Sequence, residues 1–344
     1  MRRLATLRLL FVLLFLNSPM VLSQTLDPDN IDINIEHIRG PVYMIISQGS
    51  QSGNIGLSVG EDGIFIIDDQ FAPLAPKILD TIHTLSNDPI RFIINTHWHS
   101  DHTGGNVPIV KAEGSTIIAH QNTRDHLSRD YDTKMWGLIK AREKLAWPVI
   151  TFSEHSSLHL NGEEARLIFI PEAHTDGDVI VWFRESNVIH AGDIFTDAYP
   201  YIDWASGGSI DGFLAGYDQL LNLMNEETLI IRGHGPVGLQ KDVLEQQQIV
   251  KKIRSRVAKL IEQGKAPDGV SLTQSEQIIV QGVRVTGHIN NIVVVLHLFD
   301  RLFIQSGPWR INQHGTEIIA AQVDVLQACK LTLAAQCLHK FFTG

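Results

Sequence analysis

Short apolar runs alternate with glycine-containing turns along the first part of the chain. The runs at 42–46, 54–59 and 63–68 have the length and the β-branched content of strands. From Pro76 onwards apolar residues recur every three or four positions, at Ile78, Leu79, Ile82 and Leu85. The pattern predicts a meander of three strands and then a helix with Pro76 in its first turn.

The same kind of pattern continues to about residue 264. Further strands are predicted at 90–94, 116–119, 158–160, 165–170, 179–183, 188–191 and 228–231. Helices are predicted at 120–129, at 209–224 and from Val243 to Ile261, with Gly264 as the last stop signal. Residues 131–147 are interpreted as a helix or loop insertion, in which Trp136 and Trp147 either line a pocket or belong to the core.

The first 23 residues differ from the rest of the chain. Arginines at positions 2, 3 and 8 precede an apolar run at 9–16, and Val21-Leu22-Ser23 resembles a cleavage site. The run is too short to cross a bilayer. We therefore expect a signal peptide at 1–23 and a periplasmic or secreted protein, with an uncleaved membrane anchor as the alternative.

Composition narrows the range of partners. The 344 residues are enough for one large domain or a domain with an appendage. Removal of the three signal-peptide arginines changes the net charge from −10 to −13, which disfavours nucleic acid and anionic membranes as partners. Cys329 and Cys337 are eight residues apart, about 12 Å along a shared helix, so no disulfide and no thiolate ligand are expected.

The stretch from Asn95 to Asn106 concentrates groups that bind metal ions. It follows the predicted strand at 90–94, and alternate residues of an extended chain place His97 and His99 on one side. Asp101 and His102 lie on the next turn, close enough to serve a second metal ion. A loop of solvated polar residues is the alternative, but this density of imidazoles and carboxylates favours a metal site.

Three later strands also end in residues that can bind metals. His174 follows the strand at 165–170, Asp193 follows 188–191, and His234 follows 228–231. Together these strand ends supply two sets of three ligands, with Asp193 left to bridge them, and nitrogen and oxygen donors suit a pair of zinc ions. The remaining histidines are interpreted differently: His120 and His126 as capping or surface residues, and His190 as structural.

The His-x-His-x-Asp-His pattern at 97–102, followed in order by His174, Asp193 and His234, resembles the metallo-β-lactamase superfamily. The resemblance runs from about Val42 to about Gly264. It implies an α+β fold, a four-layer αβ/βα sandwich with the metals at one edge. We expect the catalytic domain at 35–265 and a C-terminal extension, helical and of unknown role, at 266–344.

The resemblance also implies roles for the site residues. His97, His99 and His174 would hold the first zinc ion, Asp101, His102 and His234 the second, and Asp193 would bridge them. A hydroxide shared by the two ions would attack a carbonyl carbon, and Asp101 would orient it as the catalytic residue. The leading interpretation is an exported, β-lactamase-like hydrolase that cleaves an amide of a small-molecule substrate.

The sequence differs from the pattern of the family's β-lactamases at two positions, so other activities stay possible. β-Lactamases of the family generally have Cys or Ser at the position of Asp193, and one subclass has Lys at the position of Thr196. Asp193 is instead typical of glyoxalase II-like thioesterases and of lactonases, which are the main alternative. A mononuclear iron sulfur-dioxygenase-like oxidoreductase and a catalytically inactive binding protein are further alternatives.

Residues outside the predicted ligand sets receive less specific interpretations. Asp68 either supports the metal loop by a hydrogen bond or lies in a surface turn. Five aromatic residues either line the mouth of a substrate pocket or belong to the core: Phe71, Trp98, Tyr199, Tyr201 and Trp204.

Overall fold

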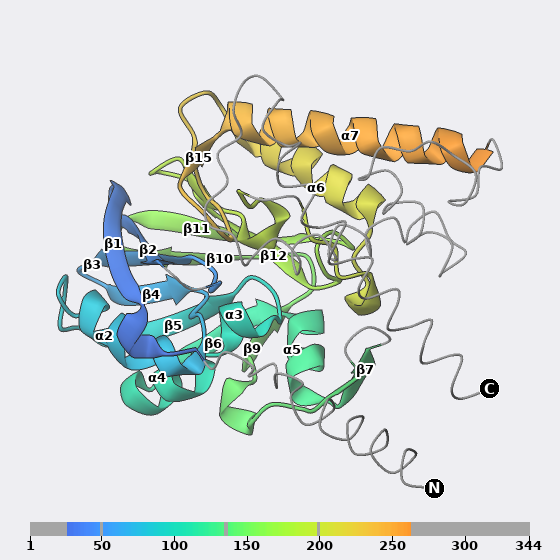
Figure 1. Cartoon of the computed structure of the whole chain (residues 1–344). Helices are drawn as coiled ribbons and strands as arrows, with labels where there is room; N and C mark the ends of the chain where they lie inside the picture. Colours follow the sequence, from blue (N-terminus) through green and yellow to red (C-terminus); the bar gives the residue numbers. More distant parts are fainter. Residues whose placement is uncertain (1–25, 49–50, 134–136, 198–199, 263–344) are drawn as a thin grey trace, which may run out of the picture.

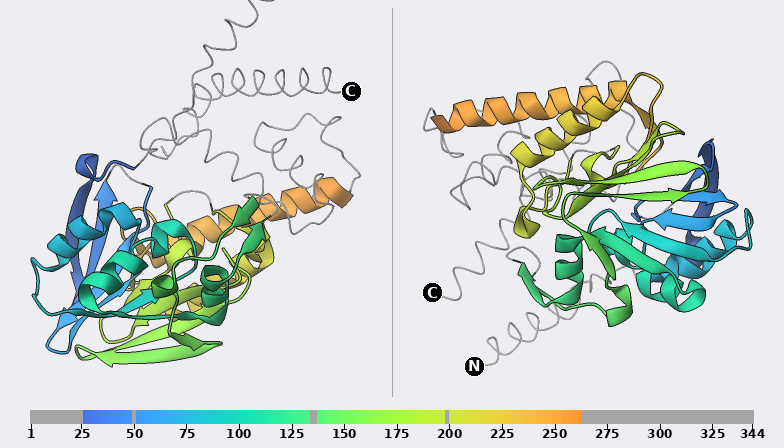
Figure 2. Two further views of the ribbon diagram at one scale, coloured as in Figure 1. Left: turned by 90° about the horizontal axis from the view of Figure 1, so that it is seen from below. Right: turned by 180° about the vertical axis from the view of Figure 1, so that it is seen from behind.

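Two mixed β-sheets pack face to face, and helices cover both outer faces (Figures 1 and 2). The computed structural model describes residues 26–48, 51–133, 137–197 and 200–262. The first sheet has seven strands in the order β1-β2-β3-β4-β5-β6-β9, and the second has six, from β10 to β15 in sequence order. This arrangement confirms the four-layer α+β sandwich expected from the sequence.

The first sheet and its helices come from the first half of the described chain. Its strands are β1 (Asp32–Arg39), β2 (Val42–Gln48), β3 (Ile55–Gly60), β4 (Gly63–Ile67), β5 (Ile90–Asn95), β6 (Thr116–His120) and β9 (Ile150–Phe152). The helices and 3₁₀ turns are η1 (Pro28–Asn30), η2 (Ala72–Leu74), α2 (Ala75–Ile82), α3 (Ser100–Thr103), α4 (Asn106–Glu113), α5 (Gln121–Ser128) and η3 (Lys144–Ala146). A separate hairpin joins β7 (Tyr131–Thr133) and β8 (Gly137–Ile139).

The second sheet and the two longest helices follow. The strands are β10 (His155–Leu160), β11 (Glu163–Ile170), β12 (Asp178–Phe183), β13 (Val188–His190), β14 (Leu229–Ile231) and β15 (Gly238–Leu239). The other elements are η4 (Gly192–Ile194), η5 (Trp204–Ser206), α6 (Ile210–Leu223) and α7 (Gln240–Glu262). Helix α7 lies along α6 on the outer face of the second sheet (Figure 1).

Three apolar cores separate the four layers. Strand β4 shows why the sequence folds this way, because it is apolar at every position after Gly63 and its side chains alternate between two cores. Ile64 and Ile66 pack beneath α2 and α4, whereas Phe65 and Ile67 face the second sheet. The third core lies between the second sheet and the helices α6 and α7. A strand buried on both faces therefore needs a continuous apolar run rather than alternation.

The strand directions bring several loops to one edge of the sandwich. Strands β4, β5 and β6 are parallel, so the loops that follow Ile67, Asn95 and His120 leave from the same edge of the first sheet. Strands β13 and β14 are also parallel, and the chain continues from them into η4 and towards His234. Six of the seven residues predicted to bind metal lie in these loops. The seventh, His174, follows β11, which runs in the same direction as β13 and so ends at the same edge of the second sheet.

Most predicted elements are confirmed, and the differences are local. Strand β1 has no counterpart in the sequence-based prediction, in which the first strand is at 42–46. The described residues of the 131–147 segment form neither one helix nor one irregular loop, since they contain the paired strands β7 and β8 and the turn η3. Gly137 has a φ of +74° at the start of β8, a backbone conformation that favours glycine.

Several predictions fall on residues outside the described ranges. These are the signal peptide at 1–23, Trp136, the helix stop at Gly264, the two cysteines and the extension at 266–344. The domain limits 35–265 stay a prediction, and β1 begins at Asp32. A search of the described helices finds none with the length and apolar character needed to cross a membrane.

The contact between Phe65 and Phe183 provides a test of the central core. Their rings stack across the two sheets with centroids 5.9 Å apart, and both side chains are fully buried. Phe183→Ala should lower the free energy of unfolding by about 3–5 kcal/mol, because it removes buried apolar surface and leaves a cavity. Urea denaturation followed by circular dichroism measures this change. Leu138→Ala, at a side chain 55% exposed, is the control and should change stability by less than about 1 kcal/mol. A small effect of Phe183→Ala would contradict this account of the core.

Candidate metal centre

The first group of candidate ligands joins two loops from different sheets. His97 and His99 follow β5, and His174 lies in the turn between β11 and β12. His99 Nδ1 is 2.9 Å from His174 Nε2, and the rings of His97 and His174 meet edge to face at 4.6 Å. The three side chains therefore direct one nitrogen each towards a common point.

The second group lies beside the first. Asp101 and His102 belong to the single turn α3, and His234 follows β14. Asp101 Oδ2 is 3.3 Å from His234 Nε2 and 3.5 Å from His102 Nε2. The helical turn places Asp101 next to His102 in space as well as in sequence, and β14 brings His234 to them from the second sheet.

The carboxylate of Asp193 lies between the two groups. Its Oδ1 is 3.2 Å from His102 Nε2 and 3.4 Å from His234 Nε2. Its Oδ2 faces the first group, 3.6 Å from His174 Nε2 and 4.0 Å from His97 Nε2. A Cβ atom on Gly233 would stand 2.0 Å from Asp193 Oδ1, so glycine is required there for this close approach. The two oxygens of Asp193 thus face different groups, and the bridging role stays a prediction.

The donor atoms fit divalent metal ions. Tetrahedral zinc with bonds of about 2.0–2.1 Å to nitrogen separates its ligand atoms by about 3.3 Å, and most of these distances are close to that value. His102 Nε2 and His234 Nε2 are 3.3 Å apart, which is the separation expected of two ligands of one zinc ion. His97 Nε2 and Asp193 Oδ1 are buried without a hydrogen-bond partner. A cation in each group would satisfy these atoms.

Burial keeps the imidazoles of the first group neutral. It lowers the pKa of His174 to about 4 and the pKa of His97 well below its usual value. The neighbouring imidazoles add to the effect on His97, because a second positive charge nearby would be unfavourable. A neutral imidazole has the free lone pair that a metal ion needs.

The second group is charged when no metal is bound. Burial opposes protonation of His234 and His102, but nearby carboxylates outweigh it, raising the pKa of His234 to about 10 and that of His102 well above its usual value. Burial likewise acts against ionisation of Asp193, yet the imidazoles of His234 and His102 hold its pKa well below the usual range. The second group is therefore a buried network of opposite charges.

Asp68 fixes two ligands from behind. Its Oδ2 accepts a hydrogen bond from His102 Nδ1 at 2.8 Å, and its two oxygens accept from the backbone nitrogen and the hydroxyl of Thr96 at 2.7 Å each. Thr96 Oγ1 is in turn 3.0 Å from His97 Nδ1. Asp68 is 1% exposed, so the supporting role is confirmed and the surface-turn alternative is wrong. Its φ of +62° is one that few residues other than glycine adopt.

Asp203 contacts the first group and was not among the residues predicted for the site. Its Oδ2 is 3.0 Å from His99 Nε2, and its side chain is fully buried. It follows no predicted strand and lies 104 residues from its partner, so no local pattern marks it. His174 is fixed by the same loop, because its Nδ1 contacts the carbonyl oxygen of Tyr201 at 2.7 Å.

Three further histidines have structural roles. His120 caps α5 by accepting a hydrogen bond from the backbone nitrogen of Asn122, as predicted. The prediction for His126 is wrong, because its side chain is buried, stacks on Trp98 with centroids 5.2 Å apart, and pairs with Asp176 at 2.8 Å. His190 is buried behind the site and belongs to neither candidate group, in agreement with its structural interpretation.

The aromatic residues proposed for a pocket have mixed positions. Trp98 is 4% exposed and packs against His126, so it belongs to the core. Tyr201 is partly exposed, and its ring lies over His99 with centroids 6.0 Å apart. Phe71 and Trp204 are half-buried, and Tyr199 lies outside the described residues. Two of these residues therefore contact candidate ligands: Trp98 lies beside His99 with ring centroids 4.8 Å apart, and Tyr201 contacts both His99 and His174.

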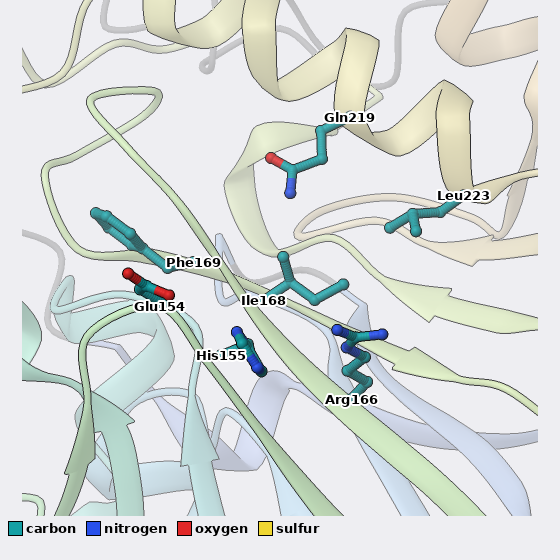
Figure 3. Close-up of a pocket in the computed structure, with 7 residues that line it drawn as sticks. All are labelled: Glu154, His155, Arg166, Ile168, Phe169, Gln219 and Leu223. Atoms are coloured by element: carbon teal, nitrogen blue, oxygen red, sulfur yellow. The ribbon is translucent and has the colours of Figure 1, made fainter.

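A separate cavity of about 420 Å³ lies away from the candidate ligands. It is lined by residues of β10, β11 and α6, among them His155, Arg166 and Gln219 (Figure 3). None of its lining residues belongs to either candidate group. The two groups, not this cavity, therefore provide the chemistry considered below.

Comparison with known proteins agrees with this geometry. The family model of the metallo-beta-lactamase superfamily matches residues 51–234, which include all seven candidate ligands. A metallo-beta-lactamase of Chryseobacterium indologenes is 23% identical over 185 residues, covering 53% of this chain and 72% of that protein. A hydroxyacylglutathione hydrolase of Rhodospirillum rubrum is 30% identical over 148 residues, covering 42% of this chain and 48% of that protein.

A solved structure shares the fold. The metallo-beta-lactamase from Pontibacter korlensis superposes with a TM-score of 0.54 at 17% identity, covering 64% of this chain and 99% of that one. At this identity the likeness concerns the arrangement of the chain alone. The family match extends over more than half of the 344 residues and includes the whole candidate site. The chain therefore belongs to the metallo-beta-lactamase superfamily.

Proposed function

We propose that this protein is an exported dinuclear zinc hydrolase that cleaves a bond at a carbonyl carbon. His97, His99 and His174 would hold the first zinc ion, and Asp101, His102 and His234 the second. The observation that carries the proposal is the carboxylate of Asp193, whose two oxygens face different groups. Superfamily members generally bind metal ions and act as hydrolases, which supports the same reaction class.

Zinc ions, when bound, would polarise a substrate carbonyl and lower the pKa of a coordinated water to about 7. The protein supplies the geometry for this chemistry. Asp68 and Thr96 hold His102 and His97 in fixed orientations, so little reorganisation is needed. The loops that carry these residues come from both sheets of the sandwich.

Asp101 is the residue proposed to position the attacking water. With 24% of its side chain exposed it is accessible to water, whereas the imidazole of His102 is fully buried. The imidazoles of His102 and His234 outweigh the effect of burial and lower its pKa to about 2. Asp101 therefore stays ionised at neutral pH and can accept a hydrogen bond from a water molecule, which orients that water.

Two substrate classes follow from different observations. The match to a metallo-beta-lactamase favours a cyclic amide, as the sequence motifs do. The bridging Asp193 and the match to a hydroxyacylglutathione hydrolase favour a thioester or lactone instead. We propose the β-lactam-like amide first and the thioester or lactone second. Export is proposed from the composition of residues 1–23 alone.

Replacement of Asp101 tests the assignment of the active site. Asp101→Ala should lower kcat/KM by about 10²–10⁴-fold, because it removes the group that positions the nucleophile. The fold should survive, since the side chain is partly exposed, and thermal unfolding would verify this. Asp80→Ala, at an exposed position on α2, is the matched control and should keep full activity. Full activity of Asp101→Ala would refute the assignment.

Proton displacement provides a test of the metal sites. At pH 7 His234 is protonated in the metal-free protein, because its pKa is about 10, and zinc must displace that proton. The zinc affinity of the second group should therefore rise at least about tenfold per pH unit between pH 7 and 9. The first group should change little over this range, because burial keeps His97 and His174 neutral, with a pKa of about 4 for His174. Competition with a chromophoric chelator at several pH values measures both affinities, and two pH-independent affinities would contradict the charge assignment.

A substrate panel distinguishes the proposed activities. Zinc-loaded mature protein should hydrolyse a chromogenic cephalosporin, a thioester or a lactone, and a chelator should abolish that turnover by removing the metal. Cephalosporin turnover would establish the amide hydrolase, and turnover of the thioester or lactone alone would establish the second class. Inactivity on all three substrates in protein that contains two zinc ions would count against a carbonyl hydrolase.

A further inference from the structure

The outer contacts of the first group include one buried carboxylate. The second nitrogens of His97 and His174 meet neutral acceptors, the hydroxyl of Thr96 and the carbonyl oxygen of Tyr201. The second nitrogen of His99 meets Asp203 instead, at 3.0 Å. His99 is therefore the imidazole of this group that has an anion behind it.

The carboxylate of Asp203 is held firmly in place. It lies just before η5, where its Oδ1 accepts a hydrogen bond from the backbone nitrogen of Ser206 at 3.2 Å and its Oδ2 accepts one from the hydroxyl of Ser206 at 2.6 Å. Its own backbone nitrogen donates to the carbonyl oxygen of His174 at 2.8 Å. The side chain is fully buried, so water cannot replace these contacts.

This contact determines which nitrogen of His99 is free. Asp203 Oδ2 can only accept a hydrogen bond, so the hydrogen of the neutral ring lies on Nε2. Nδ1, the atom that faces His174, then has a free lone pair. A carboxylate behind an imidazole also makes it a stronger donor to a metal ion.

The two groups differ in the number of carboxylates that could contact a metal ion, and this difference gives the His99–Asp203 contact its importance. The second group contains Asp101 and shares Asp193, whereas the first group contains three imidazoles and only shares Asp193. A divalent ion in the first group would therefore have less negative charge in direct contact. Asp203 supplies further negative charge one imidazole away. Asp68 stands in the equivalent place behind His102 in the second group.

We propose that Asp203 is a positioning residue that gives the first group its affinity for zinc through His99. The inference rests on the proposed function, because it requires a metal ion in that group. Asp203 does not contact the candidate metal position, and it acts by fixing the tautomer of His99 and by adding negative charge behind the ring.

Asparagine cannot reproduce both contacts of Asp203. If its oxygen faces His99 Nε2, its amide group faces the donor nitrogen of Ser206, and the reverse orientation places two hydrogen donors at His99. Asp203→Asn should therefore weaken zinc binding to the first group by about 10- to 100-fold. Asp203→Ser retains a capping acceptor in a smaller side chain and should have the same effect.

The matched control is Asp176→Asn. Asp176 pairs with His126 at 2.8 Å in the same region, but His126 belongs to neither candidate group. This variant changes a carboxylate–histidine contact of the same kind and should leave both zinc affinities within about threefold of the wild type. A general effect of losing such a contact would appear in this control as well.

The experiment uses the full mature chain and titrates zinc against a chromophoric chelator. Asp203→Asn and Asp203→Ser should raise one of two dissociation constants and leave the other unchanged. Each substitution is also placed in two backgrounds. In the His234→Ala background, Asp203→Asn should still weaken zinc binding to the first group. In the His174→Ala background, which disables the first group, Asp203→Asn should leave the remaining zinc affinity unchanged.

Several outcomes would overturn the proposal. Unchanged affinities in both Asp203 variants would do so, as would an equal loss in the His174→Ala background or failure of both variants to fold without metal. If the wild type binds two zinc ions and both Asp203 variants bind them with unchanged affinities, this inference alone is refuted. A wild-type protein that binds no zinc would refute the proposed function and this inference together.

Discussion

The candidate site depends on the contact of one buried carboxylate with four imidazoles. Asp193 reaches His97 and His174 with one oxygen and His102 and His234 with the other, at 3.2–4.0 Å. Such a carboxylate is costly to bury alone, so positive charge must balance it, and in the metal-free protein His102 and His234 carry that charge. The strands supply that charge by ending together at one edge, and Gly233 leaves the space into which the carboxylate fits.

The loops behind the site orient four of the candidate imidazoles through hydrogen bonds to their second ring nitrogens. Asp68 and Thr96 orient His102 and His97, and the 201–206 loop orients His174 and His99. Asp68 has a positive φ, which is uncommon for residues other than glycine. Its three hydrogen bonds offset the energetic cost of this conformation. These hydrogen bonds to the second ring nitrogens thus keep the other ring nitrogens directed towards the candidate metal positions.

Much of the fold could be predicted because the relevant signals are local. Continuous apolar runs such as Gly63–Ile67 predict strands buried on both faces, and the residues from His97 to His102 place four candidate ligands within six positions. The later ligands were found because each follows a strand. Asp203 and His126 were missed or misassigned because their partners are distant in sequence, and the β7–β8 hairpin because its strands have three residues each.

The candidate site lies between the two sheets, so a metal ion bound there would connect them. The first sheet ends with Phe152 and the second begins with His155, and each candidate group takes ligands from both. Zinc bound there would cross-link the two sheets. Because it would bind only the folded chain, its binding would raise the free energy of unfolding. Without zinc the protein would lose both this cross-link and the proposed hydrolytic activity. The two sheets would then separate more often, and each opening would expose the central core to proteases.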